Sequence, residues 1–167
     1  MSELKEFLVR TPFFGGLERE TLDFLAGMLV ERSFLAGATV FREGDDGKSM
    51  YVVHTGELVA NQAGDSGGTV RLMRFFEGDF FGEMTLIEMQ PRPFTVLAER
   101  DARLWELTNR NLYQLYQRDV KGYVLVLQNI NRELCRRLRR AGNRITEFAD
   151  KTEDERTQIR NDGKKLG

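Results

Sequence analysis

Short β-prone runs separated by glycine-containing turns fill the sequence between residues 31 and 107. Met50–Val53 and Thr69–Phe76 are two of these runs, and Glu43–Gly47 and Gly64–Gly68 are two of the turns. Strands spaced by about eight to twelve residues, with turn signals between them, are typical of a small β-sandwich or β-roll. The pattern therefore predicts a β-roll as the centre of the fold.

Residues 1–30, which precede this region, have helical periodicity instead. Glu3–Arg10 and Glu18–Val30 each carry apolar residues at steps of three and four, and this spacing places them on one face of a helix. Pro12 and the pair Gly15–Gly16 separate the two segments with a turn. We expect two N-terminal helices.

Helical periodicity returns over residues 108–148. Thr108 is a candidate N-cap for a short helix at about Asn109–Gln117, and Asp119 is a candidate cap for a long helix. Residues 149–167 are charged and polar, and we expect them to be disordered, or helical when packed on a partner. The chain is thus predicted to have an α+β, mainly β fold: an eight-stranded jelly-roll-like β-roll flanked by N-terminal helices and a long C-terminal helix.

Composition and charge exclude several classes of protein. The formal net charge is −1 at pH 7, whereas a dedicated nucleic-acid binder is strongly basic. The one cysteine, Cys135, cannot form an internal disulfide, and the opening residues MSELKEFLVR are too charged for a secretory signal. No stretch approaches the ~20 apolar residues of a membrane span. We expect a cytoplasmic protein that does not contact a membrane.

The count of histidines limits the chemistry further. His54, which we expect to be exposed, is the one histidine of the chain. A typical zinc site takes several histidine or cysteine ligands, and a Ser–His–Asp hydrolase needs a histidine beside its nucleophile. We therefore expect no enzymatic activity, no metal site and no cofactor.

The segment 78–98 holds the residues with the clearest chemistry. Gly82 permits a tight turn, and the N–H groups after it can together bind an anion. The carboxylate of Glu83 would repel a phosphate and therefore suits a sugar hydroxyl, while the guanidinium of Arg92 is well matched to a phosphate diester. Together these three features describe a site for a sugar phosphate.

The run FGEMTLIEMQPRPFTV resembles the phosphate-binding cassette of the cyclic nucleotide-binding domain family, found in catabolite-activator-type regulators, kinase regulatory subunits and gated channels. The residues that match at the family spacing are Phe81, Gly82, Glu83, Met84, Leu86, Pro91, Arg92, Thr95 and Val96. Upstream, EGDDGKSMYVVHTGEL resembles the turn-and-strand block of the family, and its matching residues are Glu43, Gly44, Asp45, Gly47, Tyr51, Val52, Val53, Gly56 and Leu58. The resemblance covers roughly residues 12–140.

This resemblance implies a ligand site in the cassette and a lid formed by the C-terminal helix. The implied ligand-binding residues are Gly82, Glu83, Met84, Thr85, Arg92, Pro93 and Phe94. In the basic run of the C-terminal helix, the register points to Arg136 or Arg137 as the lid contact, and a solvated helix face is the alternative. Two further alternatives stay open: Arg92 as a surface arginine paired with Glu83 or Glu88, and Glu83 as a cap of the cassette turn.

Three residues depart from the family pattern. The residue after the arginine is usually Ala or Ser, whose N–H donates to the phosphate, but Pro93 has no N–H. Loss of such a donor costs about 1–3 kcal/mol. Phe94 stands where a small residue is typical, and its ring could stack on a base or fill the base pocket itself. Thr85 stands where Ala is usual and adds a hydroxyl.

The leading hypothesis is a non-enzymatic regulatory module for signal transduction. It would bind a cyclic nucleotide and signal through movement of its C-terminal helix to an effector protein that the sequence does not identify. Cyclic AMP is favoured over cyclic GMP because Phe94 offers no hydrogen bond to a guanine edge. The long helix also predicts a homodimer.

Two alternatives remain. A degenerate domain could serve as an interaction or dimerisation module with a vestigial pocket. A transcription regulator is the third hypothesis, but the chain ends in ITEFADKTEDERTQIRNDGKKLG, which is too short and too acidic for a helix-turn-helix domain. We therefore expect no direct binding to DNA.

Overall fold

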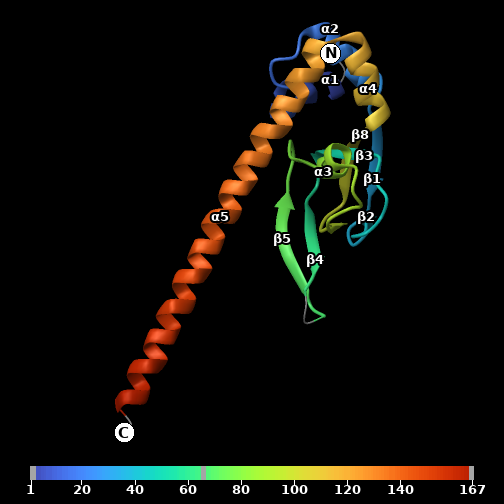
Figure 1. The fold of residues 1–167 in the computed structure, drawn as a ribbon. Coiled ribbons are helices and arrows are strands. Elements are labelled where there is room, and N and C mark those ends of the chain that lie inside the picture. Colours follow the sequence, from blue (N-terminus) through green and yellow to red (C-terminus); the bar gives the residue numbers. More distant parts are fainter. Residues whose placement is uncertain (1–2, 65–66, 166–167) are drawn as a thin grey trace. The chain divides into compact units, whose positions relative to one another are not determined.

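The computed structural model describes residues 3–64 and 67–165 and, for residues 153–165, the backbone alone. The chain forms two compact units, Met1–Asn129 and Ile130–Gly167. Figure 1 labels the helices, which are α1 (Glu3–Arg10), the 3-10 helix η1 (Pro12–Phe14), α2 (Arg19–Ala26), α3 (Glu83–Glu88), α4 (Asn109–Arg118) and α5 (Val120–Lys165). The strands are β1 (Val30–Phe34), β2 (Thr39–Phe41), β3 (Ser49–Thr55), β4 (Leu58–Ala63), β5 (Thr69–Phe75), β6 (Phe80–Phe81), β7 (Thr95–Ala98) and β8 (Ala102–Thr108).

Within the described residues, the eight strands form two four-stranded sheets with the orders β1-β8-β3-β6 and β2-β7-β4-β5. Every pair of neighbouring strands is antiparallel. Ser49 lies opposite Thr108 in the β3–β8 pair, and Asn61 lies opposite Thr95 in the β4–β7 pair. The predicted eight-stranded β-roll with helices at both ends is confirmed.

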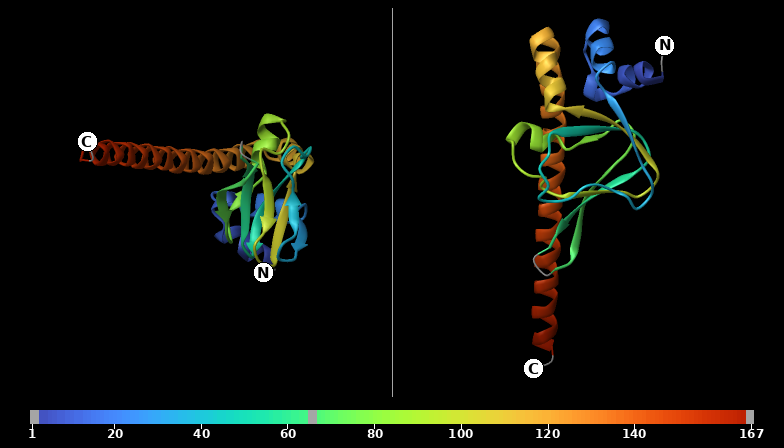
Figure 2. Two further views of the ribbon diagram at one scale, coloured as in Figure 1. Left: turned by 90° about the horizontal axis from the view of Figure 1, so that it is seen from below. Right: turned by 90° about the vertical axis from the view of Figure 1, so that its right-hand side faces the viewer.

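Apolar side chains from both sheets form the core of the roll. Burial alternates along β7, where Val96 and Ala98 are buried and their neighbours are partly exposed, because successive residues of a strand point to opposite faces. The core residues are Phe41, Val53, Leu58, Ala60, Phe75, Phe81, Phe94, Val96, Ala98, Ala102 and Leu104. The short helix α3, yellow-green in Figure 2, lies on the outer side of these strands.

Helix α1 covers part of strand β3. The ring of Phe7 lies 4.8 Å from the imidazole of His54, and the indole of Trp105 lies 5.7 Å from it. His54 is only 6% exposed, so the expectation that it is exposed is wrong. The reason is tertiary, since Phe7 is distant from His54 in the sequence and reaches it only through the folding of α1 onto the roll.

The caps predicted for the two C-terminal helices are confirmed. The hydroxyl of Thr108 accepts the N–H of Asn111 at 3.1 Å, at the start of α4. The carboxylate of Asp119 accepts the N–H of Gly122 at 2.9 Å, at the start of α5. Each side chain therefore satisfies an N–H that would otherwise have no partner within the helix.

The expectation of disorder at the C-terminus is corrected, because α5 continues to Lys165. Of the segment predicted to be disordered, 149–165 is helical, and 166–167 lie outside the described residues. Once a helix is nucleated, each added residue gains a backbone hydrogen bond, and this segment contains no proline to stop it. No helix in the described ranges is long and apolar enough to cross a membrane.

Candidate functional site

The turn that leads into α3 requires a glycine. Gly82 has a φ of +83°, in the left-handed region, and directly precedes Glu83, where α3 begins. A Cβ at this position would lie 2.7 Å from Nη1 of Arg92 and 3.2 Å from the carbonyl oxygen of Ser49. Glycine is therefore needed both for the backbone conformation and for the approach of the arginine.

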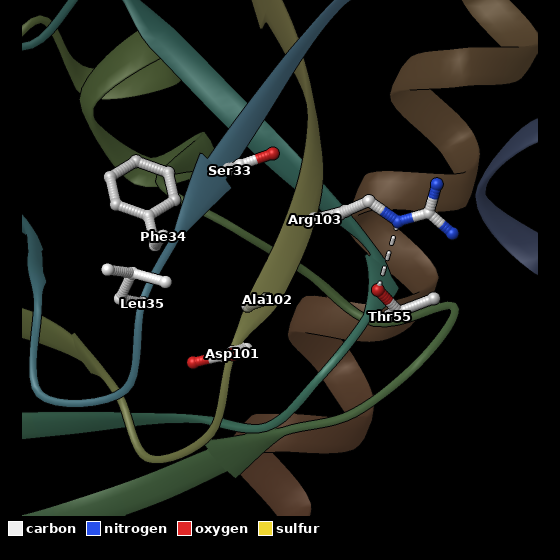
Figure 3. Close-up of a pocket in the computed structure, with 7 residues that line it drawn as sticks. All are labelled: Ser33, Phe34, Leu35, Thr55, Asp101, Ala102 and Arg103. Atoms are coloured by element: carbon white, nitrogen blue, oxygen red, sulfur yellow. Dashed lines mark hydrogen bonds between the residues drawn. The ribbon is translucent and has the colours of Figure 1, made fainter.

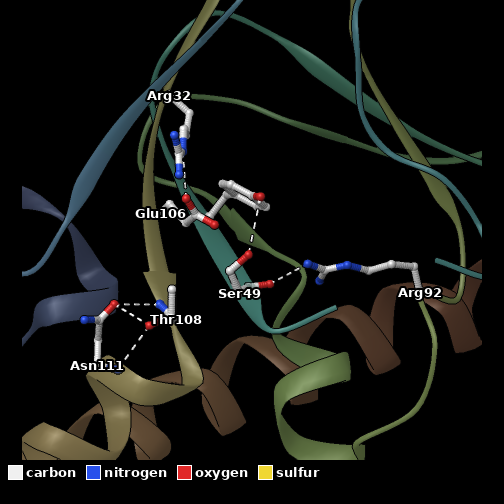
Figure 4. Close-up of polar contacts among 7 residues, drawn as sticks. Arg32, Ser49, Arg92, Glu106, Thr108 and Asn111 are labelled. Carbon is white, nitrogen blue, oxygen red and sulfur yellow. Dashed lines mark hydrogen bonds and ion pairs between the residues drawn. The ribbon is translucent and has the colours of Figure 1, made fainter. Parts of the chain in front are cut away.

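Arg92 is buried and held by backbone carbonyl groups. Only 4% of the residue is exposed, so it is not a surface arginine. Its Nη1 donates to the carbonyl of Gly82 at 3.0 Å, and its Nη2 donates to the carbonyl of Ser49 at 2.7 Å. Figure 4 shows the guanidinium reaching toward Ser49. The face of the guanidinium lies 4.1 Å from the centre of the Phe41 ring, which is a favourable cation–π distance.

Burial also changes the electrostatics of this arginine. It lowers the pKa of the Arg92 guanidinium below its ordinary value, and electrostatic interactions with Tyr51, Asp45 and Glu83 partly oppose the shift. A cation with little contact with water gains more from a bound anion than an exposed cation does. The site is therefore suited to a negatively charged ligand.

The two sequence blocks singled out above meet at Arg92. The backbone N–H of Arg92 donates to the carbonyl of Asp45 at 2.8 Å, and the N–H of Gly44 donates to the carbonyl of Arg92 at 2.9 Å. A Cβ at Gly47 would lie 2.5 Å from Nε of Arg92 and 2.8 Å from Cγ2 of Thr85. The turn 43–47 thus packs directly against Arg92.

Residues at the start of α3 face the same interior. Glu83 is 2% exposed and Thr85 is 4% exposed. The hydroxyl of Thr85 and Nε of Arg92 are buried atoms with no hydrogen-bond partner. Met84 packs against the core of the roll. The structure therefore brings Gly82, Glu83, Thr85 and Arg92 together, as the sequence predicts.

Pro93 and Phe94 have structural surroundings of their own. The carbonyl of Pro93 accepts a hydrogen bond from the side chain of Gln62 at 3.3 Å. Phe94 is 7% exposed and belongs to the core of the roll. Its ring therefore fills the interior in this conformation, and stacking on a ligand base would require the ring to move.

The two lid candidates lie in the second unit, on α5. Arg136 contacts Glu133 at 3.4 Å and Arg137 contacts it at 3.3 Å. These ion pairs join residues three and four apart on one helix, which is the spacing of neighbours on a helical surface. A contact of either arginine with the cassette stays a prediction.

Sequence reasoning missed two residues that hold Arg92, namely Ser49 and Phe41. Ser49 contributes its backbone carbonyl, which leaves no signal in a side-chain pattern. In the sequence, Phe41 looks like an ordinary core residue of a strand.

A metal site is not suggested by the structure, since no group of three or more histidine, cysteine, aspartate or glutamate side chains in the described ranges is placed to hold a metal ion.

A hollow with a volume of about 330 Å³ lies apart from the cassette. It is lined by Ser33, Phe34, Leu35, Thr55, Asp101, Ala102 and Arg103 (Figure 3). Arg103 donates to the hydroxyl of Thr55 at 3.5 Å and lies 3.4 Å from the carboxylate of Glu3. None of the predicted site residues lines this hollow. The guanidinium of Arg103 already contacts Thr55 and Glu3 of the same chain.

Comparison with known proteins points to one family. The model of the family described as "Cyclic nucleotide-binding domain" matches residues 31–119. A cAMP-dependent protein kinase regulatory subunit of Dictyostelium discoideum is 35% identical over 104 residues, which are 62% of this chain and 32% of that protein. The Cyclic AMP receptor protein of Thermus thermophilus is 30% identical over 131 residues, or 78% of this chain and 59% of that one.

Solved structures resemble the fold over a similar range. The Catabolite Activator Protein of Thermus thermophilus has a TM-score of 0.72 and 28% identity, covering 83% of this chain and 63% of that one. The regulatory domain of Toxoplasma gondii PKA, crystallised with cAMP, has a TM-score of 0.61 and 31% identity, covering 66% and 42%. The chain spans less than two thirds of the length of each of these four relatives.

Proposed function

Because the chain belongs to the cyclic nucleotide-binding domain family, we propose that it is a non-enzymatic regulatory module that binds a cyclic nucleotide and passes the signal to its C-terminal helices. The ligand would lie against the cassette, with its phosphate at Arg92 and its ribose hydroxyl at Glu83. Binding would be read by an effector protein in the cytoplasm.

One observation carries the proposal: the guanidinium of Arg92 is buried and donates hydrogen bonds to two backbone carbonyls. These carbonyls are neutral acceptors, whereas a phosphate oxygen carries a negative charge and forms a stronger hydrogen bond with a guanidinium. A phosphodiester therefore competes well for Arg92. Gly82 has no side chain, so none stands between its backbone and the guanidinium.

The same contacts suggest how binding would reach the C-terminal helices. Nη2 of Arg92 donates to the carbonyl of Ser49, and the neighbouring carbonyl of Lys48 accepts the N–H of Asn109, the first residue of α4, at 2.9 Å. A phosphate that draws the guanidinium away from Ser49 changes the support beneath the start of α4. Such a shift becomes a signal when the ligand binds the two arrangements with different affinity.

Cyclic AMP is the proposed ligand rather than cyclic GMP. Phe94 carries no group that could bond to a guanine edge, and its ring lies in the core. The Toxoplasma gondii relative named above was crystallised with cAMP. Both observations support an adenine ligand.

Isothermal titration with cyclic AMP and cyclic GMP tests the proposal. We expect Arg92→Ala to weaken binding at least tenfold, a factor of ten being about 1.4 kcal/mol. Arg100→Ala is the matched control, since Arg100 is exposed and pairs with Glu57 at 3.2 Å. The absence of heat and of a melting shift at millimolar concentrations of both nucleotides would refute the function, and an unchanged affinity of Arg92→Ala would refute the role of this arginine.

A second candidate function, an interaction or dimerisation module, is favoured by α5. Apolar residues recur along it at steps of four and three: Leu134, Leu138, Ala141, Ile145 and Phe148. Leu138, Ile145 and Phe148 are exposed in the single chain, and this spacing is that of a coiled-coil seam. A second copy of the chain is the proposed occupant.

Light scattering tests this seam. We expect a homodimer that Leu138→Glu dissociates, because a charge placed in the seam would be buried. Asn143→Glu is the control on the same helix, outside the seam. A wild-type protein that stays monomeric at high concentration would contradict the dimer. A homodimer would be compatible with the regulatory function proposed above.

A further inference from the structure

The hydroxyl of Thr85 is a polar group with no partner in a buried position. The residue is 4% exposed, and its Oγ1 makes no hydrogen bond. Buried polar atoms in proteins are nearly always hydrogen-bonded, and an unmet one costs about 1–3 kcal/mol. A threonine on a helix commonly satisfies its hydroxyl with a carbonyl of the preceding turn, but Thr85 does not. A ligand that accepts a hydrogen bond from Oγ1 would account for its position.

A second orphaned atom lies beside it. Nε of Arg92 is also buried and without a partner. A Cβ built on Gly47 would lie 2.5 Å from this Nε and 2.8 Å from Cγ2 of Thr85, so the two side chains converge on one point beside Gly47. The Thr85 atom nearest this point is the methyl carbon Cγ2, and the hydroxyl is attached to the same Cβ. The hydroxyl and the guanidinium N–H are thus two unpartnered donors in one neighbourhood. A phosphate oxygen is an acceptor that can take a hydrogen bond from each of them.

Pro93 supplies the third observation. It directly follows Arg92 and has no N–H, so the backbone cannot donate to an anion at this position. Thr85, which faces Arg92 from helix α3, carries the additional donor. The loss of one donor and the gain of another thus occur around the same guanidinium.

We infer that the Thr85 hydroxyl donates a hydrogen bond to a phosphate oxygen of the cyclic nucleotide and takes the place of the N–H that Pro93 lacks. This inference rests on the proposed function and names the atom that completes it. The ligand end at Thr85 is the phosphate, because Thr85 lies beside the guanidinium that binds it. The site thereby keeps two donating side chains for a phosphodiester, the guanidinium of Arg92 and the hydroxyl of Thr85, without a backbone N–H at residue 93.

A double-mutant cycle on the whole chain tests the inference. Thr85→Val removes the hydroxyl and keeps the shape, Thr85→Ser keeps the hydroxyl, and Pro93→Ala restores the N–H. The measured quantity is the Kd for cyclic AMP by isothermal titration, with the melting temperature of each variant without ligand as a second readout. A double-mutant cycle separates the coupling of the two positions from their individual effects.

We expect Thr85→Val to weaken cyclic AMP binding about 5- to 30-fold and Thr85→Ser to bind like the wild type. With Pro93→Ala present, the same Thr85→Val change should cost less than about threefold. The ligand-free melting temperature of Thr85→Val should equal or exceed that of the wild type, since a methyl replaces a hydroxyl that has no partner. If the hydroxyl had a purely structural role, Thr85→Val would lower the ligand-free melting temperature.

The outcomes separate the two hypotheses. A wild type that binds neither nucleotide overturns the proposed function, and the inference with it. A wild type that binds while Thr85→Val has an unchanged Kd overturns the inference alone. A loss on Thr85→Val that is equally large with and without Pro93→Ala overturns the replacement of one donor by the other.

Discussion

Replacing Gly47 by alanine tests the enclosure of Arg92 most directly. The new Cβ would lie 2.5 Å from Nε and 2.6 Å from Cζ of the guanidinium, and 2.8 Å from Cγ2 of Thr85. Cβ atoms do not approach other heavy atoms this closely, so the arginine must move. Its movement is restricted, because the Phe41 ring lies under one face and two carbonyls hold its nitrogens.

The magnitude follows from the contacts that this movement would break. A hydrogen bond from a charged group contributes about 1.5–3 kcal/mol, and a cation–π contact contributes about 0.5–2 kcal/mol. Losing one hydrogen bond and part of the stack should lower the free energy of unfolding by about 2–4 kcal/mol. For a chain of this length, that corresponds to a fall in melting temperature of about 4–16 °C.

Thermal unfolding followed by circular dichroism measures this change, and titration with cyclic AMP measures the accompanying loss of affinity. Gly68→Ala is the control, because a Cβ at Gly68 meets no atom within 4 Å. The two variants add the same methyl group, so the difference between them reports the crowding at Arg92. A Gly47→Ala protein that melts with the wild type and binds ligand equally well would refute the enclosure.

Two further predictions concern the caps of the C-terminal helices. Thr108→Val should lower the free energy of unfolding by about 0.5–2 kcal/mol, because the hydrogen bond from the Asn111 N–H to the Thr108 hydroxyl is lost. Thr108→Ser keeps a hydroxyl and should retain most of the stability of the wild type. If both variants melt with the wild type, the cap is contradicted. The pKa of Asp119 is lowered by hydrogen bonds from the Thr21 hydroxyl and the Gly122 N–H. Its contribution is therefore present above the ordinary aspartate pKa and lost as the pH falls through the lowered one. Asp119→Ala should be less stable than the wild type at pH 7, and melting curves should converge as the pH is lowered below about 4; a constant difference would contradict this linkage.

Local sequence patterns determined much of the fold and part of the site. Alternation with period two and the glycine turns predicted the β-roll, since these features act within one strand or one hairpin. Thr108 and Asp119 were identified as caps because a cap and the N–H that it accepts lie within one helical turn. The motif around Gly82 and Arg92 likewise named the residues that we propose for phosphate binding.

Other features depend on which segments the fold brings together. His54 reads as an exposed strand residue until Phe7 of α1 covers it. The helix beyond residue 148 continues from a nucleus formed earlier in the chain, whereas local composition indicated disorder. In each case a partner distant in sequence, or a helix already formed, outweighed the local preference.

The identity of Arg92 as the phosphate ligand could be proposed from sequence, but its environment could not. Its acceptors are the backbone carbonyls of Ser49 and Gly82, and every residue has such a carbonyl, so no sequence letter marks them. Its neighbour Phe41 comes from another strand. The sequence by itself determined which side chains are available for binding, and the tertiary structure decided that the guanidinium is buried beside an unpartnered hydroxyl, because burial and hydrogen-bond geometry arise only where separate segments meet.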